Sequence, residues 1–147
     1  MYERKNDLFA VVDTNVIVSG LISSNKTSAV VLVFEAVMIG IITPVFNDEI
    51  LAEYEEVLNR DKFCLPKDLV SKTLKEIQEK GVSAERVKSQ DLFEDENDKV
   101  FYEVVLSKQD AYLVTGNKKH FPQTYQVVTP AEMLDILNHI NGDITKN

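Results

Sequence analysis

Residues 8–12 form a run, Leu-Phe-Ala-Val-Val, in which every side chain is apolar, and the run ends directly at Asp13. A short run of this kind, with β-branched residues and no polar alternation, indicates a strand that is buried on both faces. Strands of that kind belong to parallel sheets, whose neighbouring strands are joined by helical crossovers. The start of the chain therefore predicts an α/β fold.

The remaining sequence continues this alternation of strands and helices. Further strands are expected at residues 41–43, where Pro44 stops the strand, at 111–115 and at 126–128, with a weaker candidate at 84–88. Apolar residues at helical spacing, together with capping residues, predict helices at 29–38, 47–59, 66–80, 98–108 and 129–140. Small polar residues between Asp13 and Asn25 indicate a loop. We expect a three-layer fold, with helices on both faces of a mostly parallel sheet.

The charge of the chain limits how it can bind a polyanion. The 147 residues fit one domain spanning 1–147, and 16 Lys and Arg against 24 Asp and Glu give a net charge of −8. Because phosphate binding depends on Lys and Arg displacing counterions, an acidic chain does not hold nucleic acid by a general positive field. A polyanionic substrate would need another positive group at the site.

Compartment is indicated by the single cysteine and by hydropathy. Cys64 cannot form an intramolecular disulfide, which suits a reducing compartment. The charged start of the chain does not have the pattern of a signal peptide. The most apolar longer stretch, residues 29–42, is interrupted by Glu35 and is shorter than the roughly 20 residues that cross a bilayer. We expect a cytoplasmic protein without a membrane segment.

Polar residues follow two of the predicted strands, at the edge where doubly wound sheets carry their functional groups. Asp13-Thr14-Asn15 follows the first strand, and Thr115-Gly116-Asn117 follows the fourth. Because Asp13 comes directly after five apolar residues, its carboxylate begins close to the sheet, where it is costly unless it is paired or bound to a cation. The alternative is that Asp13 caps a turn through Thr14 or Asn15.

Other acidic residues have two interpretations as well. Glu49 and Glu53 share one helix face, and Glu49 is explained by the helix dipole, whereas Glu53 is either a solvated surface residue or a functional one. The acidic run 94–98 precedes a helix, and it either caps that helix or turns one carboxylate toward Asp13. Spacing does not choose among its four acids.

Carboxylates and an amide from separate segments, converging on one sheet edge, predict a site for Mg²⁺ or Mn²⁺. Such an ion attracts phosphodiesters and activates water for in-line attack. The only histidines, His120 and His139, do not make a His-rich zinc site, and the chain has neither a P-loop nor a dinucleotide-binding glycine motif. Lys118 and Lys119 are candidates for contacting substrate phosphates, or they form an ordinary charged loop.

Four pieces of the sequence, in this order, resemble the PIN domain family, the nuclease fold of VapBC-type toxins and of ribosomal-RNA processing factors. The pieces are residues 11–16 (VVDTNV), residues 47–54 (NDEILAEY), Asp98 at the opening of a helix, and residues 110–117 (DAYLVTGN). The resemblance is strongest to the branch described as VapC-like toxin components, whose last motif ends T-G-D where this chain has Thr115-Gly116-Asn117.

The resemblance implies both a fold and a site. It implies a five-stranded sheet in the order 3-2-1-4-5 and a homodimer. It makes Asp13, Glu53 and Asp98 the catalytic acids that bind Mg²⁺ or Mn²⁺, with Asn117 in place of the fourth family acid and with one charge fewer. Asn15 and Thr115 would support the site. The implied function is metal-dependent RNA hydrolysis by the toxin of a type II pair, with RNA and a small antitoxin as partners.

Two alternatives stay open. Asn117 and the lack of a basic patch are compatible with an inactive PIN-like scaffold that binds RNA or protein. A phosphohydrolase with Asp13 as nucleophile is weaker, because such enzymes usually carry a second aspartate where this chain has Asn15.

Overall fold

The structure is a computed structural model that describes the backbone of residues 8–145 and the side chains of residues 8–140. Its strands are β1 (Leu8–Val12), β2 (Ile42–Phe46), β3 (Val82–Ser83), β4 (Ala111–Val114) and β5 (Val127–Val128). Its helices are α1 (Thr14–Ile22), α2 (Ala29–Met38), α3 (Asp48–Leu58), α4 (Lys67–Lys80), α5 (Glu96–Leu106) and α6 (Pro130–Thr145), with 3₁₀ turns at Asp61–Phe63 and Lys118–His120.

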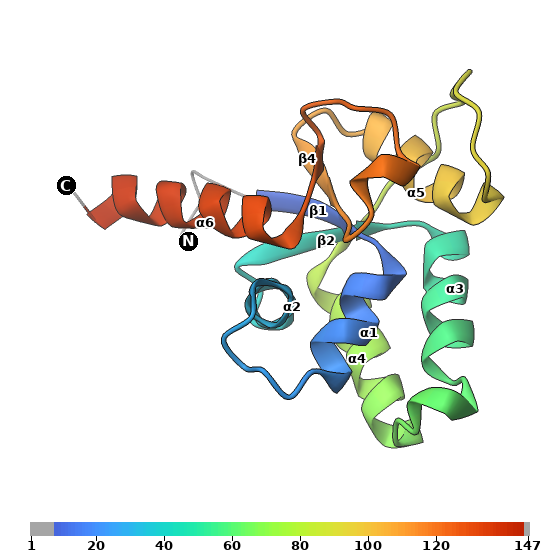
Figure 1. Ribbon diagram of the computed structural model, residues 1–147, viewed down its shortest axis with the longest axis vertical. Helices are drawn as coiled ribbons and strands as arrows, with labels where there is room; N and C mark the ends of the chain where they lie inside the picture. The colour runs from blue at the N-terminus through green and yellow to red at the C-terminus, as the bar shows by residue number, and fades with distance from the viewer. Residues whose placement is uncertain (1–7, 146–147) are drawn as a thin grey trace.

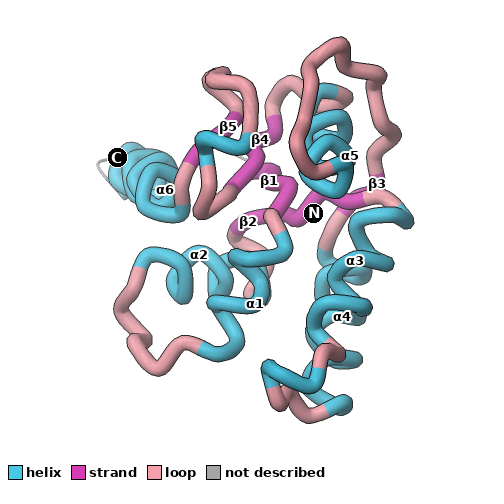
Figure 2. Tube along the Cα trace, turned by 45° about the vertical axis from the view of Figure 1, so that its right-hand side comes forward, coloured by secondary structure: helices cyan, strands magenta, loops and turns pink. Residues whose placement is uncertain are grey.

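The five strands form one parallel sheet in the order β3-β2-β1-β4-β5, which confirms the α/β fold and the strand order expected from the sequence. Helices α1 to α4 lie on one side of the sheet, with α6 beside α2, and α5 lies on the other side (Figures 1 and 2). The apolar side chains of β1 and β4 are buried between these layers. Among the described residues, no helix combines the length and the apolar character needed to cross a membrane.

The loop predicted after Asp13 is wrong in its first half, because α1 begins directly after β1. Ser19 and Gly20 were interpreted as loop residues, but they lie on this helix, whose Val16 and Ile17 are buried. A Cβ on Gly20 would lie 2.4 Å from the ring of Phe34 in α2. The small residues therefore serve close packing of two helices, and they do not mark a turn.

The second strand also differs from the prediction, since β2 runs through Pro44 to Phe46. Proline lacks an N–H, yet no ladder bond to β1 is lost here. The Pro44 carbonyl faces Gly81 at the end of α4, so the N–H that proline lacks would point to the same side, away from β1. On that side, pairing with β3 begins only at Val45.

The strand predicted at residues 84–88 is in fact β3 at Val82–Ser83. Its pairing with β2 ends when the Ala84 N–H donates to the carbonyl of Phe46 at 2.9 Å. Three residues later the Val87 N–H donates to the backbone carbonyl of Glu103, at 3.0 Å. The chain has thus left the sheet edge and runs along α5.

The close approach at Gly81 gives a stability prediction. A Cβ at this residue would lie 2.4 Å from the Pro44 carbonyl oxygen and 2.7 Å from that of Ile77, both of which are backbone atoms. We expect Gly81→Ala to lower the free energy of unfolding by about 1–3 kcal/mol, as overpacking does. Urea unfolding followed by circular dichroism measures the loss.

Gly116→Ala is the matched control, because a Cβ at Gly116 meets no atom within 4 Å. Equal effects of the two substitutions would show that the contact with β2 is not what requires glycine at Gly81.

Candidate active site

The register of the two central strands brings the predicted strand-end residues together. Val12 of β1 pairs with Val114 of β4, and the Asp13 N–H donates to the Val114 carbonyl at 2.9 Å. The next residues are therefore neighbours, and the Thr115 hydroxyl donates to Oδ2 of Asp13 at 2.7 Å. The same hydroxyl accepts from the Asn117 N–H at 3.0 Å. Asp13, Thr115 and Asn117 thus form one hydrogen-bonded unit.

Asp13 is the most deeply buried acid of this edge, with 6 % of its surface exposed. Burial raises the pKa of its carboxyl group, while the hydrogen bond from Thr115 and the nearby backbone N–H groups of Asn15 and Thr14 lower it. Asp13 is the N-cap residue of α1, but its side chain accepts no capping hydrogen bond from the first turn, so Thr115 and not a helix cap holds this carboxylate. Asn15, which was expected to support the site, lies in the first turn of this helix and lines the pocket beside Asp13.

Glu53 is held beside Asp13 by the residue between them in space, Thr14. The Thr14 hydroxyl donates to Oε2 of Glu53, and the next residue of α3, Tyr54, donates its hydroxyl to the carbonyl of Val12. Two consecutive residues of α3 are thereby attached to the end of β1. Burial raises the pKa of Glu53, the Thr14 hydrogen bond lowers it, and the charges of Asp13 and other nearby acids raise it further.

Asp98 lies in the first turn of α5, on the opposite side of the sheet from α3. Burial, together with repulsion from Asp13 and Asp95, raises the pKa of Asp98 to about 6. Nδ1 of His120 lies 3.6 Å from Oδ2 of Asp98 and opposes the shift. Spacing did not choose among the acids of residues 94–98. The structure gives Asp95 the role of N-cap, since its Oδ1 accepts from the Asn97 N–H at 2.9 Å.

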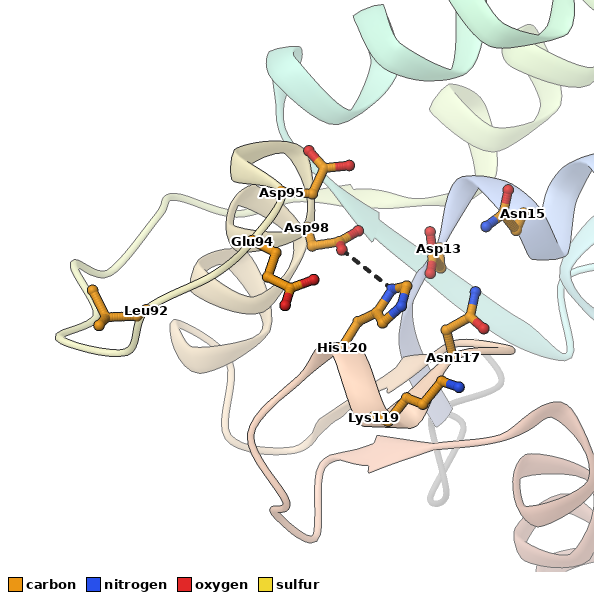
Figure 3. Close-up of a pocket in the computed structure, with 9 residues that line it drawn as sticks. All are labelled: Asp13, Asn15, Leu92, Glu94, Asp95, Asp98, Asn117, Lys119 and His120. Atoms are coloured by element: carbon orange, nitrogen blue, oxygen red, sulfur yellow. Dashed lines mark ion pairs between the residues drawn. The ribbon is translucent and has the colours of Figure 1, made fainter.

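These residues border a pocket of about 590 Å³ at the carboxyl edge of the sheet, shown in Figure 3. Its lining consists of Asp13, Asn15, Leu92, Glu94, Asp95, Asp98, Asn117, Lys119 and His120. In the figure, Asp98 and His120 point toward each other and Asp13 and Asn117 lie beside them, with Leu92 at the outer end.

Two predicted residues are placed differently. Glu53 borders this region through Thr14 and is not part of the pocket lining. Lys118 is held outside by Glu132, with Nζ and Oε1 3.0 Å apart, whereas Lys119 lines the pocket.

Three residues of the site were missed or underrated by sequence reasoning. Thr14 carries the link to Glu53, Asp95 adds charge beside Asp98, and His120 faces Asp98. From the sequence, His120 was considered only in excluding a His-rich zinc site. Its only sequence signal is its closeness in the chain to Asn117.

The donor set fits a hard divalent cation. The site offers carboxylate and amide oxygens, with an open pocket beside them, and the mutual repulsion of its acids is what a cation would remove. Within the described part of the chain, no group of three His, Cys, Asp or Glu side chains is already arranged as a metal-binding cluster. Mg²⁺ keeps several waters and is often held by one or two carboxylates, so such a cluster is not required.

The parallel sheet and the acidic pocket place the protein among α/β domains whose ligands bind beyond the strand ends. A family model described as a PIN domain matches residues 10–119, and the chain therefore belongs to the PIN domain family. PIN domains are generally nucleases that use divalent metal ions, so the fold is of the nuclease type. Searches of curated proteins and of solved structures gave no match.

The repulsion around Asp98 predicts a pH-dependent stability. Its folded-state pKa of about 6 exceeds the ordinary value of 3.8, so between these pH values the folded protein binds a proton that the unfolded chain has released. The Asp98 carboxyl group therefore contributes fully to the free energy of unfolding below pH 3.8, and this contribution is lost as the pH rises through about 6. At pH 7 without divalent ions, we expect Asp98→Asn to raise the melting temperature by a few degrees, and the gain to disappear near pH 4.

Asp135→Asn serves as the control, because Asp135 is exposed on α6 and lies outside the site. Differential scanning fluorimetry across this pH range makes the measurement. A destabilised Asp98→Asn protein at pH 7 would contradict the assigned repulsion.

Proposed function

We propose that this protein is a Mg²⁺- or Mn²⁺-dependent ribonuclease that hydrolyses RNA phosphodiester bonds. The observation that carries the proposal is the convergence of Asp13, Glu53 and Asp98 from three separate segments, with raised pKa values for all three. Carboxylates that are held close together with perturbed pKa values are typical of functional sites. Asn117, attached to Thr115, completes the set with a neutral oxygen.

Asp13 and Asp98 would hold the ion, with Glu53 acting directly or through a bound water. The ion supplies the positive charge that the acidic chain lacks and lowers the pKa of the attacking water. Thr115 fixes one oxygen of Asp13, which leaves its other oxygen free of that hydrogen bond. Thr14 holds Glu53 in the same way, so both carboxylates are oriented before a substrate arrives.

Nitrogen donors at the pocket suit the flanking phosphates of an RNA strand. Lys119 and His120 both line the pocket, and we assign them the contact with phosphate oxygens. Lys118 takes this role only if it leaves Glu132, so we rank it second. With few cations present, binding of RNA would depend strongly on the divalent ion.

The direct test is cleavage of single-stranded RNA by the wild type and by Asp13→Asn, with Mn²⁺ or Mg²⁺ supplied. The substitution keeps the size of the side chain and removes its charge. We expect cleavage to fall by at least about 100-fold, the upper end of what loss of a supporting residue of a metal site costs. Chelation of the divalent ion should abolish wild-type cleavage.

Asp110→Asn is the control, since Asp110 is exposed and pairs only locally with Lys108, at 3.0 Å. Equal cleavage by the wild type and Asp13→Asn would reject the proposal. A folded wild type that neither cleaves RNA nor binds Mn²⁺ would favour the second candidate, an inactive scaffold, for which the neutral Asn117 is the motivating residue.

We further propose that the nuclease is the toxin of a type II pair, acting on cytoplasmic RNA as a homodimer and inhibited by a small antitoxin. The resemblance of the D-T-N-V and V-T-G-N segments to VapC-like proteins supports this. Expression of the wild type in bacterial cells should slow growth, whereas Asp13→Asn should not, and co-expression of a small neighbouring gene should restore growth. Normal growth with active nuclease present would argue against a toxin.

A further inference from the structure

Two of the proposed metal-binding acids lie on helices that face different sides of the sheet. Glu53 is on α3 and Asp98 is on α5. The helices touch through the rings of Tyr54 and Phe101, whose centroids are 6.2 Å apart. Because Glu53 and Asp98 repel each other, contacts such as this one must resist a force that separates the helices.

A second connection between these helices is made by Arg86, in the loop between β3 and α5. This loop is drawn in pink beside α5 in Figure 2. Nη1 of Arg86 lies 2.9 Å from Oε2 and 3.1 Å from Oε1 of Glu49 on α3. Its Nε and Nη2 lie 2.8 and 2.6 Å from Oε1 of Glu103 on α5. One guanidinium group therefore joins both helices, a bond geometry that lysine cannot reproduce.

The α5 end of this connection is rigid. Glu103 is only 4 % exposed, and its other oxygen accepts from the Ser89 N–H at 2.6 Å. Burial alone would raise the pKa of Glu103, but the hydrogen bonds from Ser89 and Arg86 hold it below its ordinary value. The carboxylate is thus ionised and fully partnered, which fixes Arg86 on α5.

The α3 end is placed next to the site. Glu49 precedes Glu53 by four residues, so the two side chains lie on the same face of α3, one turn apart. The charges that most affect the pKa of Asp98 are those of Asp13, Asp95, His120 and Glu53, and Arg86 is not among them. An effect of Arg86 on the site would therefore act mainly through the positions of the two helices that it joins.

We propose that Arg86 is a positioning residue, a clamp between Glu49 and Glu103 that sets the separation of Glu53 and Asp98 and thereby the affinity of the site for a divalent cation. This inference rests on the proposed function for its role in metal binding. The clamp itself is a statement about two helices, which is testable without any metal.

The sharpest variant is Glu49→Ala, which releases α3 and leaves the buried pair of Arg86 and Glu103 intact. The Glu49 side chain is 54 % exposed, and exposed ion pairs contribute little to stability, so the fold should persist. Its matched control is Glu56→Ala, which breaks the Arg60 pair on the same helix, with Nη2 and Oε2 2.9 Å apart. Both variants remove one charge from α3.

The first measurement is titration of each protein with Mn²⁺ alone by calorimetry, with melting temperatures recorded in parallel. We expect Glu49→Ala to bind Mn²⁺ about tenfold more weakly than the wild type, as loss of a supporting residue does. Glu56→Ala should bind nearly as the wild type does. The charge of Glu56 raises the pKa of Glu53, whereas Glu49 is not among the causes of that shift. If loss of a negative charge were enough to weaken Mn²⁺ binding, Glu56→Ala would therefore weaken it at least as much as Glu49→Ala. Equal affinities of the two variants would overturn the clamp as a determinant of metal binding.

The second measurement uses no metal. Nitroxide labels at Glu55 of α3 and Glu96 of α5, both exposed, report the helix separation in a Cys64→Ser background. The distance distribution should broaden in Glu49→Ala and stay narrow in Glu56→Ala, and an unchanged distribution in both would overturn the clamp. If the wild type binds no Mn²⁺, the proposed function fails, while this distance measurement still decides whether the clamp exists.

Discussion

The site depends on the parallel pairing of β1 with β4. In a parallel pair, residues at the same register position end their strands side by side, so Asp13 and Thr115 meet because Val12 pairs with Val114. The Asp13 N–H continues the ladder by donating to the Val114 carbonyl, and the Thr115 hydroxyl donates to one oxygen of the Asp13 carboxylate. A slip of one residue would turn Asp13 to the other face of the sheet and leave a buried charge without a partner.

Around this fixed carboxylate, the fold gathers further negative charge and supplies the contacts that hold it in place. The Thr14 hydroxyl holds Glu53, and His120 faces Asp98. Each carboxylate thus has a partner that offsets part of the free energy lost on burial, yet the pKa values of Asp13, Glu53 and Asp98 all remain raised. The fold therefore places carboxylates that repel one another at one edge of the sheet, and a bound cation would remove this repulsion.

The sequence predicted the sheet edge well because its signal is local. The apolar run 8–12 and the polar residues after it fix both the strand and the position of Asp13. The errors have physical causes that lie far away in the chain. Gly20 is small because Phe34 packs against it, and Pro44 stays in a strand because β3 does not pair with it. No local pattern reports these tertiary contacts.

The same limit applies within the site. The acids of residues 94–98 look alike in sequence, and only packing of α5 distinguishes the capping Asp95 from Asp98. Glu53 was an ordinary helix glutamate until Thr14 was seen to hold it. Family resemblance singled out Glu53 and Asp98, and in the structure Asp98 lines the pocket whereas Glu53 lies beside it. The resemblance does not say what holds these side chains in place. The tertiary contacts of Thr14 with Glu53 and of His120 with Asp98 supply that information.

The proposed ribonuclease activity requires an acidic chain to bind an acidic substrate. The net charge of −8 repels a polyanion, and the pocket adds Glu94 and Asp95 to the acids of the site. Lys119 is the lysine of the lining, and the lining carboxylates outnumber it. Under this proposal, an RNA phosphate would approach the pocket favourably only after a divalent ion had reversed the local potential, since a bound ion is often the largest charge in such a site. Substrate binding and metal binding are for this reason expected to be coupled.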